Sequence, residues 1–153
     1  MATNRKSPAK ITQHGAIYFW KYKTDGWLGS EWHFTADSAG CDFLIQRFDY
    51  MFQSEFPCET AIQLTPVSQK ILRIPDYNSP FKNIDELQFS YRPAGSNYYE
   101  WTIVDNKNRV DLTMGKAMLA EWKRAVLAVK NGTGDFSIGL HEDHTIFMWR
   151  MPL

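Results

Sequence analysis

Hydrophobic and polar positions follow the same order twice along the chain. Residues 16–64 read as a strand, a tight turn, a second strand, an amphipathic helix and a third strand, and residues 98–139 repeat this order. In the strands apolar residues alternate with polar ones, whereas in the helices they recur every three or four positions. Asp25-Gly26 is a typical hairpin turn because both positions tolerate positive φ. The pattern predicts two ββαβ-like units, which can share one sheet with both helices on one face.

Two long amphipathic helices are predicted, over residues 38–54 and 115–130. Asp37 or Ser38 can cap the first helix by accepting hydrogen bonds from exposed backbone amides. Gly132 can end the second helix because glycine readily adopts the left-handed conformation. The apolar stripes that should be buried contain Cys41, Leu44, Ile45, Phe48, Met51 and Phe52 in the first helix, and Met118, Trp122, Ala125, Val126 and Val129 in the second.

Two further cap positions follow from hydroxyl side chains that precede helical segments. Thr113 is placed to cap the second long helix. Thr65, followed by Pro66 at a first helical position, predicts one or two helical turns over residues 67–72.

The middle of the chain predicts a three-stranded antiparallel meander over residues 87–92, 98–104 and 109–113. The fold class expected is therefore α+β, with one antiparallel meandering sheet of about six to eight strands and two main helices packed on one face. Residues 13–153 are expected to form a single domain, preceded by a disordered basic tail over residues 1–12.

Charge and cysteine content limit the binding partners and the cellular compartment that we expect for the protein. The 17 basic and 17 acidic residues cancel, so nothing draws the chain toward nucleic acid or an anionic membrane. No stretch approaches the ~18 apolar residues of a membrane span, and no signal peptide is evident. Two cysteines do not make a disulfide framework, so we expect a cytoplasmic protein with reduced thiols. A homo-oligomer is compatible with these features.

Aromatic residues make up 15% of the chain and gather on the first predicted hairpin. If these rings face outward, they form a platform for sugars, bases or partner side chains; the alternative is that a helix or another strand covers them. The loop over residues 75–83 is the next candidate contact surface. The candidate ligand- or partner-binding residues are Tyr18, Trp20, Trp27, His33, Tyr77 and Phe81.

Two weaker patterns suggest chemistry. His141 and His144 lie in a His-Glu-Asp-His segment that could bind zinc, although a third ligand is not evident and a polar turn is the alternative. Cys41 falls in the first turn of a helix, where the dipole lowers a thiol pKa, but it also falls on the apolar stripe, as a structural thiol would. No cofactor is predicted.

The leading hypothesis is a small non-catalytic protein that binds another protein, such as a regulatory partner, an immunity-type inhibitor or an accessory subunit. One alternative is a domain that binds a small molecule or a carbohydrate on the concave side of its sheet. Another is a metal- or thiol-dependent enzyme that uses His141, His144 or Cys41.

Overall fold

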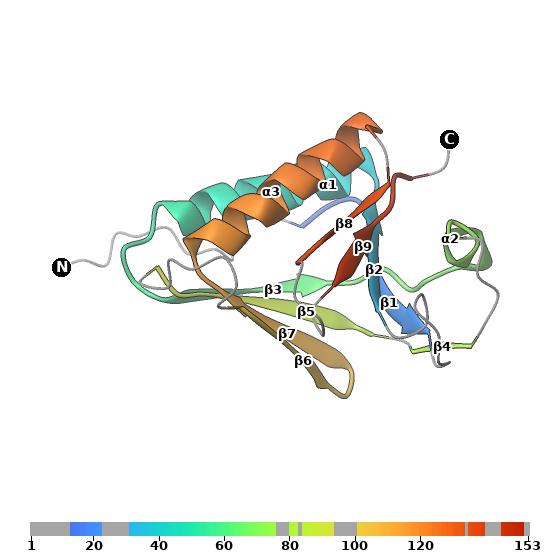
Figure 1. The fold of residues 1–153 in the computed structure, drawn as a ribbon, viewed down its shortest axis with the longest axis horizontal. Helices are drawn as coiled ribbons and strands as arrows, with labels where there is room; N and C mark the ends of the chain where they lie inside the picture. Colours follow the sequence, from blue (N-terminus) through green and yellow to red (C-terminus); the bar gives the residue numbers. More distant parts are fainter. Residues whose placement is uncertain are drawn as a thin grey trace.

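The protein has the predicted α+β class, but its strands form two sheets instead of one. The structure is a computed structural model. It describes residues 13–22, 31–75, 80–82, 84–93, 101–133, 135–139 and 145–151. One sheet has five strands in the order β4-β1-β2-β9-β8, and the other has four in the order β3-β5-β7-β6 (Figure 1). The prediction of a basic tail over residues 1–12 lies outside the described residues.

Both sheets are mixed, so the prediction of a purely antiparallel sheet was wrong. The five-stranded sheet consists of β4 (Phe81–Lys82), β1 (Ile17–Tyr22), β2 (Trp32–Ala36), β9 (Ile146–Met148) and β8 (Phe136–Ile138). The four-stranded sheet consists of β3 (Cys58–Gln63), β5 (Glu86–Tyr91), β7 (Arg109–Met114) and β6 (Thr102–Asn106). The pairs β2–β9 and β5–β7 are parallel, and the remaining pairs are antiparallel.

The predicted meander was wrong in its strand order. β7 lies between β5 and β6, so these two consecutive strands are not neighbours. The predicted alternation of apolar residues was nevertheless confirmed in β5, where Leu87, Phe89 and Tyr91 are buried. Strand alternation separates the two faces of a strand, but it contains no information on which strand lies beside it.

The structure contains the predicted repeat of two strands followed by a helix. After each helix, the chain adds strands to the sheet that contains the hairpin of the other repeat. The hairpin β1–β2 is followed by α1 (Ser38–Phe52) and then by β3 and β5, which pair beside β7. The hairpin β6–β7 is followed by α3 (Lys116–Asn131) and then by β8 and β9, which pair beside β2. Each sheet therefore combines a hairpin from one unit with an antiparallel strand pair from the other. The two parts are joined by a parallel pairing, β2 with β9 in one sheet and β5 with β7 in the other.

The helix caps were predicted with mixed success. Asp37 caps α1, because its side chain accepts a hydrogen bond from the Gly40 amide at 2.7 Å. Gly132 ends α3 in the left-handed conformation, with φ of 66°. Thr113 belongs to β7 and Gly115 precedes α3 without a side-chain cap, so that prediction was wrong. Ser68, not Thr65, caps the short helix α2 (Gln69–Leu72).

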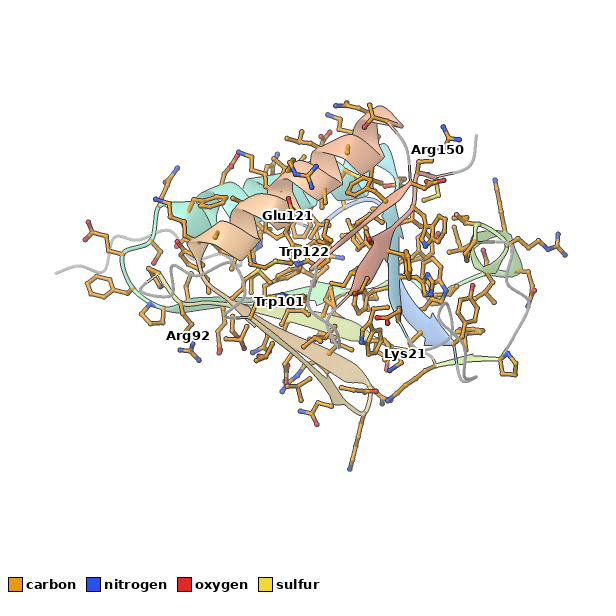
Figure 2. All side chains as sticks on the ribbon, viewed as in Figure 1. Lys21, Arg92, Trp101, Glu121, Trp122 and Arg150 are labelled. Carbon is orange, nitrogen blue, oxygen red and sulfur yellow. The ribbon has the colours of Figure 1, made fainter. Side chains whose placement is uncertain are left out.

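The main core lies between the two long helices and both sheets. α1 and α3 run side by side above the four-stranded sheet, and Figure 2 shows Trp122 beneath α3, toward the strands (Figures 1 and 2). The ring of Trp122 meets Phe34 of β2 at 5.5 Å, Phe89 of β5 at 5.2 Å and Phe48 of α1 at 6.3 Å between centroids. One α3 side chain thus connects both sheets and both helices. Within the described part of the chain, no helix combines the length and apolar character needed to cross a membrane.

Candidate functional site

The outer face of the five-stranded sheet, turned away from the main core, is unusually rich in aromatic side chains. Directly opposed residues share a face, so the pairs Tyr18–Thr35 and Trp20–His33 lie on this side, while Phe19–Phe34 lies on the core side. β9 continues the row, because its Phe147 is paired with His33. We define the aromatic face as Tyr18, Trp20, Tyr22, His33, Thr35, Phe81, Phe147 and Trp149.

His33 lies at the centre of this face, surrounded by four rings. Its imidazole stacks on Trp20 and Phe147, each with a centroid distance of 5.4 Å and an interplanar angle of 20°. Trp149 is nearly parallel to it at 6.1 Å, and Tyr22 meets it edge-on at 5.1 Å. Such contacts add favourable geometry to the area that the rings bury.

A hydrogen bond fixes the tautomer of His33. The indole Nε1 of Trp149 donates to Nδ1 of His33 at 3.0 Å. An indole N–H can only donate, so Nδ1 must accept and a neutral His33 carries its proton on Nε2. The histidine is thus held in one orientation by residues from β1, β9 and the segment after β9.

The short helix α2 covers part of the aromatic face. In Figure 1 it lies on the side of β1 and β2 that is away from α1 and α3. Ile71 and Leu72 pack with Trp20 and Tyr22, and the Tyr22 hydroxyl donates to the Leu72 carbonyl at 3.0 Å. The partly buried members of this second cluster are Tyr18, Val67, Ile74, Phe81, Trp149 and Met151.

Four of the six predicted contact residues are described, and two of them are not exposed. Trp20 and His33 have 0% exposed area, so the condition that the platform face outward is not met for them. The covering element that the sequence left open as an alternative is α2 for Trp20, whereas Phe147 and Trp149 pack on His33. Tyr18 and Phe81 are partly buried at the edge of the cluster. Trp27 and Tyr77 lie outside the described residues, as do His141 and His144.

Two polar atoms inside the aromatic face lack partners. Within the described part of the chain, neither Nε1 of Trp20 nor Oγ1 of Thr35 makes a hydrogen bond, and both side chains have 0% exposed area. Buried polar groups without partners are uncommon in native proteins. Thr35 was not among the predicted site residues. Its signal in the sequence was weak, since a threonine in a strand usually reflects β propensity alone.

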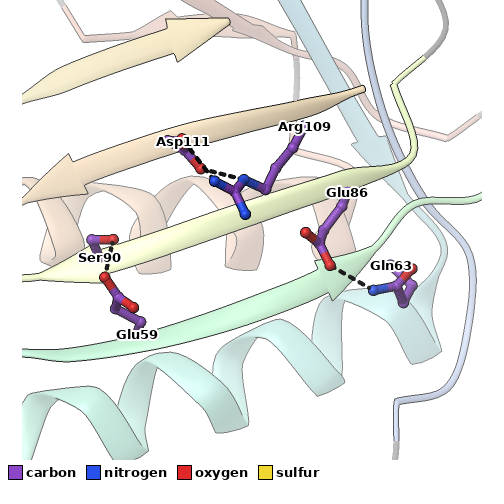
Figure 3. A network of polar contacts seen from close by, with 6 residues as sticks. All are labelled: Glu59, Gln63, Glu86, Ser90, Arg109 and Asp111. Carbon is purple, nitrogen blue, oxygen red and sulfur yellow. Dashed lines mark hydrogen bonds and ion pairs between the residues drawn. The ribbon is translucent and has the colours of Figure 1, made fainter. Parts of the chain in front are cut away.

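The other sheet presents a polar outer face, which sequence reasoning did not propose as a site. Figure 3 shows Glu59 accepting from Ser90 at 3.3 Å, Gln63 donating to Glu86 at 3.0 Å, and Arg109 paired with Asp111 at 2.8 Å. These positions alternate with the core residues of β3, β5 and β7. Polar side chains that pair with one another on one face are typical of a sheet with one solvated side.

The cysteines do not have the properties of nucleophiles. Burial, with smaller contributions from Asp37 and Asp42, raises the pKa of the Cys41 thiol to about 12. Burial also raises the pKa of Cys58. Of the two alternatives that the sequence left open for Cys41, the burial and the raised pKa favour the structural thiol, because desolvation of the thiolate outweighs the dipole there. Among the described residues, no three His, Cys, Asp or Glu side chains cluster as metal ligands would.

Comparison of the chain with protein-family models, curated proteins and solved structures gave no match.

Proposed function

We propose that this protein is a non-catalytic interaction module that binds another protein through the rim of the aromatic face. We define the rim as Tyr18, Phe81, Phe147 and Trp149, which are all partly buried. The observation that carries the proposal is that these rings surround a fully buried aromatic centre on a single sheet face. Trp and Tyr are enriched among the residues that dominate protein–protein affinity, and such residues lie beside well-packed, desolvated centres.

The charge of the chain fits a contact of this kind. The 17 basic and 17 acidic residues leave no net charge, so long-range attraction contributes little to the encounter. Affinity would come from removing the exposed part of the rim rings from water. We place the protein in the cytoplasm as part of the same proposal, since Cys41 and Cys58 are both unpaired thiols.

Native mass spectrometry of the protein, purified gently from its own host, tests the proposal. The wild type should carry a stoichiometric second protein chain, and Tyr18→Ala and Phe147→Ala should carry clearly less of it. Phe56→Ala is the matched control, because Phe56 is 59% exposed and lies outside the aromatic face. It should retain the partner.

Three results would contradict the proposal. The native mass of the wild type could correspond to a single chain, or to two copies of this chain. The rim variants could also retain as much partner as Phe56→Ala. Melting temperatures of all variants must accompany the comparison, because a rim variant that unfolds loses its partner for an unrelated reason.

A further inference from the structure

Trp20 and Thr35 are neighbours on the aromatic face. Trp20 opposes His33 and Thr35 opposes Tyr18, so the two residues occupy diagonal positions on adjacent strands. Diagonal neighbours lie about 7–8 Å apart across an antiparallel pair. This spacing is short enough for one small molecule to contact both side chains.

The missing partners of these two groups need an explanation. Burial removes water from a donor, and without a new hydrogen bond the fold loses stability. Val at position 35 would fill a similar volume without a polar atom, and Phe at position 20 would keep an aromatic ring without one. A face that binds a ligand with hydrogen-bonding atoms needs polar side chains as partners, and positions 20 and 35 supply two of them side by side.

The surrounding rings indicate the shape of such a ligand. Thr35 lies between Tyr18 of β1 and Trp149, which follows β9, because the β2–β9 register pairs Phe34 with Met148. A short side chain therefore separates two large rings. Trp20, His33 and Phe147 already stack in one row on this face, and a planar molecule could add to that stack.

The polar groups of the site limit its chemistry. Tyr18, Trp149 and neutral His33 carry no formal charge, so a charged ligand would be desolvated without a counter-charge. A sugar carries several hydroxyls that each need a partner when buried, and the pair Trp20–Thr35 supplies only two polar groups. A heteroaromatic ring with one or two acceptor atoms matches both the stack and the two donors.

Access to Trp20 would require α2 to move. α2 has only four residues, and it lies against the face through Ile71, Leu72 and the bond from the Tyr22 hydroxyl to the Leu72 carbonyl. A ring that entered beside Trp20 would replace contacts of these two aliphatic side chains with aromatic ones.

We propose that the aromatic face binds a small, uncharged, planar heteroaromatic molecule, which accepts hydrogen bonds from Nε1 of Trp20 and Oγ1 of Thr35 after α2 shifts aside. This activity goes beyond the protein interaction proposed above and uses different atoms, since neither Trp20 nor Thr35 belongs to the rim. The two proposals can therefore fail separately.

The test compares the wild type with Thr35→Val and Trp20→Phe on the full chain. The probes are nicotinamide, uracil and lumichrome as uncharged heteroaromatic molecules, and N-acetylglucosamine as a carbohydrate. Melting temperature without and with millimolar probe gives stabilisation, and titration of tryptophan fluorescence gives the dissociation constant. At least one heteroaromatic probe should raise the melting temperature of the wild type, because a ligand that binds only the folded state stabilises it.

The variants should separate stability from binding. Thr35→Val should melt at or above the wild-type temperature without probe, since it removes an unpaired buried hydroxyl. It should bind the active probe roughly five- to tenfold more weakly, as loss of one hydrogen bond predicts. Trp20→Phe should weaken binding in the same way. Thr102→Val is the control for the substitution itself, because Thr102 is exposed on β6 of the other sheet.

Each other outcome overturns the proposal. The proposal fails if no heteroaromatic probe stabilises the wild type, or if Thr35→Val and Trp20→Phe bind the active probe as tightly as Thr102→Val does. Binding of N-acetylglucosamine alone would assign the face to carbohydrates and reject the heteroaromatic class. A marked fall in the melting temperature of Thr35→Val without probe would show that the hydroxyl already has a stabilising partner in the folded protein.

Discussion

Single residues connect parts of this molecule that are far apart in the sequence. Trp122 has 0% exposed area, and its ring contacts Phe34, Phe48 and Phe89, which come from β2, α1 and β5. Sequence periodicity placed Trp122 on the buried stripe of its helix, and the structure confirms it. The sequence could not show that one strand from each sheet and the helix α1 converge on this one ring.

Replacing Trp122 with alanine should be strongly destabilising. The change removes a large buried ring and leaves a cavity, so Trp122→Ala should lower the free energy of unfolding by about 3–5 kcal/mol. Leu127→Ala is the matched control on the same helix, because Leu127 is 38% exposed, and it should change stability by less than about 0.5 kcal/mol. Urea titration followed by circular dichroism measures both. Similar midpoints for the two variants would show that Trp122 is not central to the core.

Cys41 illustrates how burial decides the chemistry of a side chain. Its sulfur donates to the Ala36 carbonyl at 3.7 Å, and burial raises its pKa from 9.0 to about 12. The same helix position would favour a thiolate if it were exposed. The thiol is therefore structural, which the sequence had left open beside the nucleophile.

This shift in pKa predicts a pH dependence of stability. The unfolded thiol ionises above about pH 9 and the folded one only near pH 12, so the contribution of Cys41 is complete below pH 9 and decreases as the pH rises. Between pH 9 and 11, the wild type should lose about 1.4 kcal/mol per pH unit more than Cys41→Ser. Urea titrations at several pH values measure the difference, and Cys58→Ser, which keeps Cys41, is the control. Parallel curves for wild type and Cys41→Ser would contradict the prediction.

At the scale of elements, local signals define the helices and their ends well. The prediction over residues 115–130 differs from α3 by one residue at each end. Gly132 adopts φ of 66°, and a Cβ placed there would have no atom within 4 Å. Backbone conformation, and not lack of space, is therefore the reason for glycine at this position.

Gly132 can be tested with two substitutions that differ only in their tolerance of the left-handed region. Gly132→Ala should lower the free energy of unfolding by about 1 kcal/mol through backbone strain. Gly132→Asn should cost less, because asparagine visits this conformation more readily. Thermal or urea unfolding distinguishes them. An alanine variant as stable as the wild type would mean that α3 can end without the left-handed residue.

At the scale of the whole molecule, the exchange of strands makes the two units interdependent. The sheet that contains β1 and β2 is completed by β8 and β9, and the sheet that contains β6 and β7 is completed by β3 and β5. The ion pair between Lys82 of β4 and Asp105 of β6, at 2.6 Å, is a further contact between the sheets. Neither unit can bury the faces of its own hairpin alone.

Separated halves should therefore not fold independently. Fragments 1–96 and 97–153 should each lack a cooperative thermal transition, because each would expose strands that normally pair with the other half. An equimolar mixture should regain near-native circular dichroism and a single transition. Cooperative unfolding of the first fragment by itself would show that it is a complete domain.

The aromatic face could be predicted from the sequence only in part. Alternation in β1 and β2 separates Trp20 and His33 from Phe19 and Phe34, so membership of one face was predictable. The stack with Phe147 and the bond to Trp149 join positions more than 100 residues apart, and no local pattern contains that contact. The cover by α2 also comes from a distant segment, which lies between β3 of the other sheet and β4. Exposure of the aromatic residues could therefore not be decided from their own hairpin.

The sequence by itself determined the α+β class, the repeated ββα order, both long helices and the inward faces of the strands, because these depend on the spacing of neighbouring side chains. The tertiary structure alone decided that there are two sheets, that β5 and β7 run parallel, that Trp20 is buried under α2, and that His33 is buried among aromatic rings of β1 and the β9 region. The physical reason is that backbone hydrogen-bonding groups are nearly identical in every strand. The choice of neighbour is therefore made by packing of the whole chain around residues such as Trp122.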